Sequence, residues 1–324
     1  MSGLDQARAW LLRPVRPERL ALLRILVSAY GLVWLVVRAP HLRDVARLPE
    51  GRWDPVGVLA PLDGPPPSGL MAALVVVAIL SGGATLVGWR FRLTGPVFAL
   101  TLLVVTTWRN CWGQIFHTEN LLVLHALVLA LAPAAAAWAL DSNRGLDVRR
   151  GGDGKRRGRP EPGPAAGAAV RVMALRTVST YVVAGVAKLR YGGLAWLDGD
   201  VLLHQVAFDN LRKAVVGDPF SPLADLLVGA RWLFVPFAVA TLAVELGAPL
   251  ALLSARAARV WSATAWVFHL GVLVTMVILF AYPLTGVALA PVLLFHGDGV
   301  PLPRVRAWVR NRRSAAPRAR SLAG

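Results

Sequence analysis

The feature that most constrains this chain is a series of long apolar runs. A helix needs about 20 mostly apolar residues to cross a bilayer, and eight runs reach or approach that length. We expect membrane-spanning helices at residues 20–37, 70–87, 93–108, 120–140, 165–187, 231–254, 260–282 and 284–295. The third and the eighth are short for a full crossing. The sequence therefore predicts an all-α integral membrane protein, a multi-pass helical bundle of about eight transmembrane helices in the cell membrane.

The composition agrees with a lipid bilayer as the main partner. Residues of the set AVILMFWYC make up 56% of the 324, and only 16% are charged, whereas soluble domains are about half apolar and a quarter charged. The net charge is +17, but the basic residues lie between apolar runs, so we expect no nucleic-acid partner. Cys111 is the only cysteine, which excludes an internal disulfide and a cysteine-rich metal site.

Lysine and arginine residues set the predicted orientation. The connections on one side of the membrane carry 22 of them and those on the other side carry nine, and the richer side is normally cytoplasmic. We therefore expect both termini in the cytoplasm, with a basic segment at 1–19, a flexible linker at 141–164 and a basic tail at 298–324. The outer loops would be 38–69 and 188–229, and the second is long enough to fold over the outer surface.

Ionisable residues inside apolar runs are candidates for function, because a charge within a membrane is costly. Arg176 and Glu245 lie near the middle of their runs, and we predict an intramembrane ion pair between them, which could serve packing alone. Arg24 lies one turn into the first run and could extend its charge to the cytoplasmic surface. His269 lies within the seventh run.

A second group of polar residues opens the fourth run. His117, Asn120 and His125 would share a broad face of one regular helix. Two histidines that bind a metal are normally four positions apart, so we expect no metal here; proton transfer suits His117, and packing suits His125. Lys188 ends the fifth run and is either an anchor at the membrane interface or a partly desolvated amine that acts as a base.

Several segments, taken in order, resemble one family. They resemble the HTTM family, the transmembrane domain shared with vitamin K-dependent gamma-carboxylase, over roughly residues 20–297. Its Y-x-x-A-G-x-x-K-L and W-x-x-G signature resembles YVVAGVAKL at 181–189 and WLDG at 196–199. The other similar segments are FHTENLL at 116–122, WALD at 138–141 and VFHL at 267–270, followed by Phe280 and Phe295.

The resemblance implies roles for individual residues. Lys188 would be the base that deprotonates a reduced quinone, either menaquinol or vitamin K hydroquinone. His117 would assist as a second catalytic group, and Asn120 would orient an intermediate. The remaining residues of the implied quinol pocket are Tyr181, Trp196 and His269. The resemblance thus implies quinol-dependent chemistry, of the lyase or oxygenase type, at the outer face of the membrane.

Other functions stay open at this point. The sequence ends soon after its last apolar run and has six residues between K-L and W. It is thus more similar to bacterial HTTM proteins that lack the large extramembrane domain of the carboxylase, including some linked to maturation of secreted peptide toxins. The alternative is a non-catalytic membrane partner in the maturation or export of a secreted peptide, or a binder of lipid or quinone. A transporter would need broken helices in paired halves, and none is visible.

Overall fold

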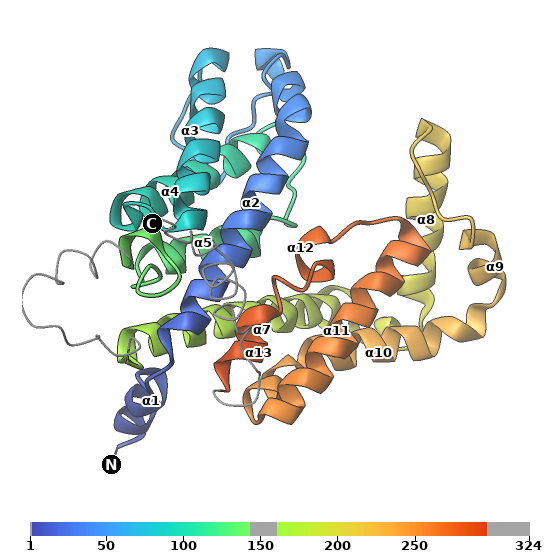
Figure 1. Cartoon of the computed structure of the whole chain (residues 1–324). Helices are drawn as coiled ribbons and strands as arrows, with labels where there is room; N and C mark the ends of the chain where they lie inside the picture. The colour runs from blue at the N-terminus through green and yellow to red at the C-terminus, as the bar shows by residue number, and fades with distance from the viewer. Residues whose placement is uncertain (1, 143–160, 297–324) are drawn as a thin grey trace, which may run out of the picture.

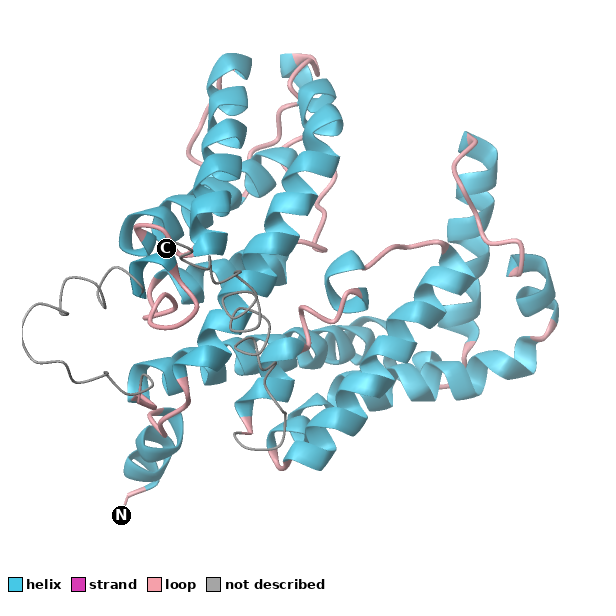
Figure 2. Ribbon diagram, viewed as in Figure 1, coloured by secondary structure: helices cyan, strands magenta, loops and turns pink. Residues whose placement is uncertain are grey.

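The structure, a computed structural model, describes residues 2–142 and 161–296. Every regular element in these two ranges is a helix (Figure 2), and the single β-type contact there is an isolated bridge between Val15 and Gly163. The predicted all-α class is therefore confirmed for this part of the chain. Most of the predicted linker 141–164, and the whole predicted tail 298–324, lie outside the described residues.

Five of the described helices are long and apolar enough to cross a bilayer. They are α2 (Pro17–Val45), α3 (Ser68–Val87), α4 (Phe91–Arg109), α7 (Pro164–Gly192) and α11 (Ala255–Met276). The shortest of them, α4, has 19 residues and is about 28 Å long at 1.5 Å per residue. That length nearly matches the hydrocarbon core of a bilayer, about 30 Å. These helices support the predicted membrane protein.

The predicted fourth span is shorter than expected. The run 120–140 forms α5 (Asn120–Ala130), and turns follow from 131 to 139. Pro133 explains this end, because proline lacks an N–H and its ring clashes with the preceding turn of a helix. With 11 residues, α5 is about 16 Å long, which is half of a crossing.

Two further predicted spans are interrupted. The run 231–254 forms α10 (Phe234–Leu246) and the 3₁₀ helix η5 (Ala248–Leu252), separated by one glycine. In the run 284–295, the last residues form the short helix α13 (Ala290–Phe295), and turns precede it. An apolar run records burial or lipid contact but does not show where a glycine or proline ends a helix. Eight crossings therefore stay a prediction.

Arg24 binds the backbone of the interrupted fourth span. Its guanidinium is fully buried and donates to the backbone oxygens of Ala134, at 3.1 Å, and Trp138, at 2.6 Å. The expectation that Arg24 extends to the cytoplasmic surface is therefore wrong, because carbonyl groups freed by the broken helix bind it inside the protein. Nearby, the Asp141 carboxylate accepts the N–H groups of Arg90 and Phe91, both at 2.8 Å, and so caps the start of α4.

The predicted outer loop 188–229 is mostly helical. After the last residues of α7 it forms η3 (Gly193–Trp196), α8 (Asp200–Val216) and α9 (Ala224–Gly229). Three side chains of this segment donate to the last carbonyl groups of α11, which a helix end leaves without partners. These contacts are Lys213 to Met276, Asn210 to Thr275 at 3.0 Å, and Ser221 to Val274 at 2.7 Å.

The other terminal and loop segments hold short helices. The N-terminal segment 1–19 contains α1 (Gly3–Leu11), and the loop 38–69 begins with the end of α2 and contains η1 (Glu50–Arg52) and η2 (Gly57–Leu59). A further short helix, α12 (Ala281–Leu284), follows α11.

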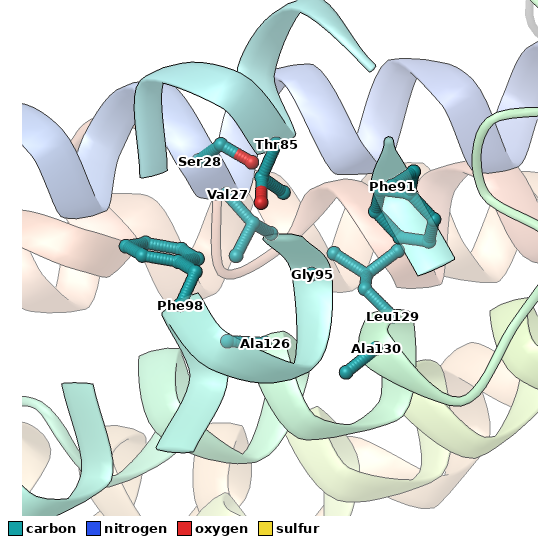
Figure 3. Close-up of a pocket in the computed structure, with 9 residues that line it drawn as sticks. All are labelled: Val27, Ser28, Thr85, Phe91, Gly95, Phe98, Ala126, Leu129 and Ala130. Atoms are coloured by element: carbon teal, nitrogen blue, oxygen red, sulfur yellow. The ribbon is translucent and has the colours of Figure 1, made fainter. Parts of the chain in front are cut away.

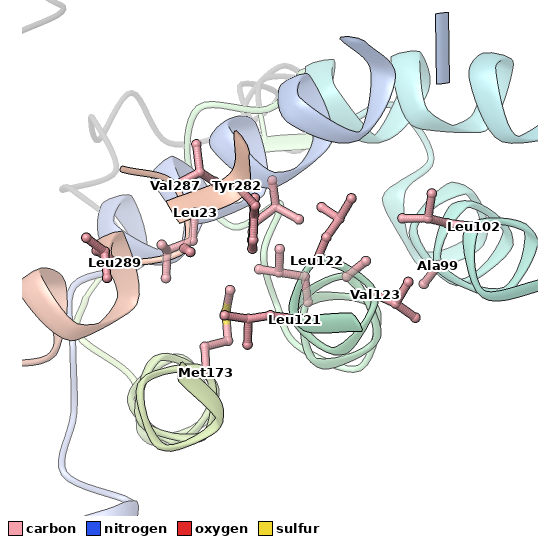
Figure 4. Packing of buried hydrophobic residues seen from close by; sticks show 14 of the residues in the cluster. Leu23, Ala99, Leu102, Leu121, Leu122, Val123, Met173, Tyr282, Val287 and Leu289 are labelled. Atoms are coloured by element: carbon pink, nitrogen blue, oxygen red, sulfur yellow. The ribbon is translucent and has the colours of Figure 1, made fainter. Parts of the chain in front are cut away.

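Helix α7 joins two groups of helices. Figure 1 shows α2, α3, α4 and α5 on one side and α8, α10 and α11 on the other, with α7 running along both. Figure 4 shows the core where α7 meets the first group, with Met173 of α7 close to Leu121 and Leu122 of α5. The C-terminal half of α7 leaves this core and packs on α10, which places Lys188 in the second group.

A small cavity lies in the first group of helices (Figure 3). It is lined mainly by apolar side chains, among them Val27, Phe98 and Leu129. Its volume of about 10 Å³ is roughly that of one water probe, so it cannot hold an aromatic ring. We therefore place the candidate site elsewhere, around Lys188.

Candidate functional site

The candidate site is built on an ion pair between two helices. The Lys188 Nζ atom of α7 is hydrogen-bonded to the Glu245 Oε1 atom of α10. The Glu245 side chain is 4% exposed and that of Lys188 is 23% exposed. The carboxylate is thus inside the protein, whereas the lysine side chain is partly exposed.

Gly185 makes this ion pair possible. It lies one turn before Lys188 on the same face of α7, at the crossing with α10. A Cβ atom at Gly185 would lie 2.8 Å from Leu246 Cδ2 and 3.1 Å from Glu245 Cβ. The absence of a side chain therefore lets α10 come close enough for Glu245 to reach the lysine.

The second motif segment supplies two residues, Trp196 and Gly199, to this site. The Lys188 Nζ atom lies 5.3 Å from the centre of the Trp196 ring, within the range of a cation–π contact. Trp196 is buried against Ala238 of α10. Gly199 has φ of +85°, and a Cβ there would lie 2.6 Å from the backbone carbon of Phe234. Both glycines of the two motifs thus serve the close approach of α10.

Tyr181 and His269 form a second buried contact next to the ion pair. Tyr181 lies two turns before Lys188 on α7, and its hydroxyl is 2.8 Å from the His269 Nε2 atom of α11. Both residues are more than nine-tenths buried. The Tyr181 ring also packs edge-on against Trp261, with the ring centres 4.9 Å apart. The structure thus places Tyr181 on the same helix as Lys188, and His269 of α11 within hydrogen-bond distance of Tyr181.

His117 and Asn120 lie just before and at the start of α5. Both are exposed, and His117 precedes α5, so the common helical face predicted for them with His125 does not form. The His117 ring is 5.8 Å from the Phe280 ring, which in turn is 5.1 Å from the His269 ring. A row of rings therefore connects His117 with the buried part of the site.

His125 has a separate, structural environment. It is fully buried, and its Nδ1 and Nε2 atoms lie 2.8 Å from the Tyr282 hydroxyl and 3.2 Å from the Met173 backbone oxygen. These contacts join α5, α7 and α12. The packing role suggested by the sequence fits this position.

Glu245 has a different partner from the one expected. The structure pairs it with Lys188 and leaves Arg176 exposed on α7. Arg176 lies twelve positions before Lys188 along the helix, about 18 Å at 1.5 Å per residue. The sequence identified Glu245 as notable but could not give the depth at which α10 crosses α7.

A buried ion pair near His117 escaped the sequence analysis. Glu119 accepts hydrogen bonds from Arg109 and Trp34, both at 3.0 Å, and from Thr118 at 2.7 Å. The Arg109 and Glu119 side chains are 5% and 9% exposed. The signal was present, because Glu119 lies inside the FHTENLL segment and Arg109 directly follows an apolar run. This cluster fixes the segment that carries His117 and Asn120.

Three buried polar atoms of the site have no hydrogen-bond partner among the described residues. They are Glu245 Oε2, Trp196 Nε1 and His269 Nδ1. Buried polar atoms are normally hydrogen-bonded, so Glu245 Oε2 provides an acceptor and Trp196 Nε1 a donor for a bound group, whereas the tautomer of His269 sets whether its Nδ1 atom donates or accepts. In the same ranges no group of three His, Cys, Asp or Glu side chains could hold a metal ion.

Comparison of the chain with family models, with curated proteins and with solved structures gives no match. The function is therefore argued from the site itself and from the resemblance of its motifs.

Proposed function

We propose that this chain is a membrane enzyme that acts on a reduced quinone, similar in chemistry to the HTTM domain of vitamin K-dependent gamma-carboxylase. The observation that carries the proposal is the cluster of Lys188, Glu245 and Trp196, three groups brought together by α7, η3 and α10. Residues of both motif segments that resemble the family take part in it.

The chemistry of the cluster fits a quinol. When bound, a reduced quinone supplies an acidic hydroxyl group and electrons for reaction with oxygen. Lys188 presents N–H groups at the site's edge, and Trp196 presents an aromatic face beside them. The unpartnered Trp196 Nε1 and Glu245 Oε2 atoms add a donor and an acceptor. A quinol dissolved in the bilayer could reach a lysine whose side chain is partly exposed.

The other predicted residues would have supporting roles. Tyr181 and His269 would line the buried wall of the pocket, since their contact lies beside the ion pair. His117 would hold or release a proton at the exposed end of the row of rings, and Asn120 would orient a group next to it. In this proposal Lys188 and His117 are the catalytic residues, menaquinol or vitamin K hydroquinone is the bound quinone, and the site faces the outer side of the membrane.

The first test is an assay of purified protein in lipid nanodiscs. Wild type and Lys188→Ala would receive reduced menaquinone or vitamin K with oxygen, and mass spectrometry would measure quinone epoxide. We expect product from wild type and at least about 100-fold less from Lys188→Ala, because proton transfer by one side chain contributes about 10²–10⁴-fold.

Lys213→Ala is the matched control for this assay. Lys213 also lies in the predicted outer segment and also forms an ion pair, with Asp209 at 2.7 Å, but it contacts α11 and not Trp196. Its variant should keep the activity of wild type. Absence of product from wild type with every quinol tested would overturn the proposed function.

A second function is favoured by one surface. α8 exposes Phe208, Leu211 and Val215, each at least 65% accessible, and such apolar surface often marks a binding site. A non-catalytic binder of lipid or of a secreted peptide would use this face and leave Lys188 as an anchor. In that event Lys188→Arg would not alter binding, whereas Phe208→Asp would weaken it.

A further inference from the structure

The hydrogen bond to Glu245 limits how Lys188 can act as a base. A lysine acts as a base only in its neutral form, since the ammonium group has three N–H donors and no acceptor. A carboxylate in hydrogen-bond contact stabilises the ammonium form, and Glu245 is in such contact. The lysine in this structure is therefore unsuited to accept a proton unless it gives one away at the same time.

Glu245 is the group that can take that proton. Its carboxylate is buried, and its Oε2 atom has no hydrogen-bond partner among the described residues. A buried carboxylate with one unsatisfied oxygen is less stabilised than one with both oxygens bound. When a negatively charged ligand oxygen lies beside the ammonium group, Glu245 can be protonated without leaving that ammonium unpaired, so the pair can take up one additional proton.

Within residues 2–142 and 161–296, no second charged acceptor is in contact with the pair. The ionisable groups that face it are Tyr181, from α7, and His269, from α11, and these two are hydrogen-bonded to each other. Trp196, from η3, covers the lysine with a ring that does not ionise. Among the described residues next to Lys188, the carboxylate is thus the natural acceptor.

We propose that Lys188 and Glu245 act as one unit, in which Lys188 relays a proton and Glu245 finally holds it. This inference rests on the proposed function. The Lys188 Nζ atom takes the proton of a ligand hydroxyl while it passes one of its own protons to Glu245 Oε1. One O–H bond and one N–H bond break, and one N–H bond and one O–H bond form. The electron pair stays on the ligand oxygen, whose negative charge then lies beside the ammonium group, and no oxidant is needed for this step.

Glu245 is thereby a positioning and proton-holding residue that acts through Lys188. Two substitutions separate this role from that of a simple partner. Glu245→Gln keeps the size and one hydrogen-bond acceptor but cannot hold the proton. Glu245→Asp keeps the carboxylate and shortens the side chain by one methylene group.

The experiment measures epoxide formation in nanodiscs across pH 6 to 9 for wild type and both variants. A range of pH is needed because the relay and a lysine that acts as a base by itself predict different pH profiles. We expect Glu245→Gln to lose about 100-fold or more at every pH, and Glu245→Asp to keep a measurable part of the activity. If Lys188 were a base by itself, Glu245→Gln would stay active, with its profile moved to lower pH, because the ammonium form would have lost its partner.

A second readout needs no turnover. Difference infrared spectra would be recorded when 1-naphthol, an ionisable but unreactive phenol, binds to wild type. We expect a new band of a protonated carboxyl group, absent in Glu245→Gln and still present in Glu119→Gln, which removes another buried carboxylate. Bound naphthol without such a band in wild type would overturn the inference.

The outcomes distinguish the two proposals. No epoxide from wild type overturns the proposed function. An active wild type with a folded Glu245→Gln that is equally active, or a folded Glu245→Asp that is as inactive as Glu245→Gln, overturns the relay and leaves the proposed function in place. Elution of the nanodiscs as one sharp peak and unchanged naphthol binding would establish that a variant is folded.

Discussion

Lys188 shows how strongly one neighbour decides what a side chain can do. At the end of an apolar helix, a lysine usually reaches for lipid headgroups and water. Here its amine is hydrogen-bonded to the buried carboxylate of Glu245, which lies 57 positions later in the chain, and the indole ring of Trp196 lies next to the amine. An anchor needs neither contact, so the environment of this residue favours a role in a site.

Cys111 offers a prediction at the same scale, on a residue outside the spanning helices. It lies just after α4 and is fully buried, and burial raises the pKa of its thiol. A raised pKa means that less thiolate is present at pH 8 than in an exposed cysteine, and the thiolate is the reactive form. We expect Cys111 to react with a maleimide much more slowly in folded than in unfolded protein, with a rate that still rises above pH 9. Mass spectrometry after timed labelling measures this, and rapid labelling of folded protein at pH 7 would contradict it.

Individual residues of the site were predictable to different degrees. Lys188, Tyr181 and Trp196 belong to motif segments that are continuous in sequence, so their positions on one helix and its following turn could be foreseen. The partner of Glu245 could not, since it depends on how α10 is rotated and how deeply it crosses α7. Glu119 lies between His117 and Asn120 in the same segment, but its burial depends on contacts with Trp34 and Arg109 that the order of residues does not give.

At the scale of elements, the crossing of α7 and α10 depends on one glycine. We predict that Gly185→Ala destabilises the protein by about 1–3 kcal/mol, because the added methyl group overpacks against Leu246 and Glu245. Thermal unfolding in the same detergent for wild type and variant measures this. The substitution should also lower activity, since it separates Glu245 from Lys188.

Gly271→Ala is the matched control for that prediction. Gly271 also lies inside a long helix, α11, but a Cβ there would meet nothing within 4 Å. Because alanine favours a helix over glycine by about 0.5–1 kcal/mol, this variant should be as stable as wild type or slightly more so. Equal effects of the two substitutions would show that helix crossing is not the cause.

The elements themselves were foreseen where an apolar run is uninterrupted. All five long helices overlap predicted spans, and each extends beyond its apolar run at one or both ends, although α11 ends at Met276, before the predicted end at 282. Within the other three predicted spans the helices are interrupted near Pro133, at Gly247 and before α13, because hydropathy measures the preference of side chains and not the continuity of backbone hydrogen bonds. The helical content of the outer segment 188–229 was likewise not specified, since its apolar and polar residues are mixed.

At the scale of the whole molecule, the orientation in the membrane remains to be tested. We predict that α1 lies on the cytoplasmic side and α9 on the outer side. Leu4 and Leu226 are 84% and 72% exposed, so each can be replaced by cysteine in a Cys111→Ser background. A membrane-impermeant maleimide should label Leu226→Cys in intact cells and label Leu4→Cys only after the cells are opened. The reverse pattern would invert the topology and move the proposed site to the cytoplasmic side.

The buried Arg24 has a consequence for how the protein is made. Its two carbonyl acceptors lie 110 and 114 positions later in the chain. At about 5–20 residues per second, a ribosome needs roughly 6–23 s to synthesise them after the arginine. During that interval the first long helix carries an uncompensated charge that a bilayer does not tolerate well. We therefore expect this helix to take its final place only after the turn that follows α5 has been made, so that a single arginine would order the membrane assembly of this protein in time.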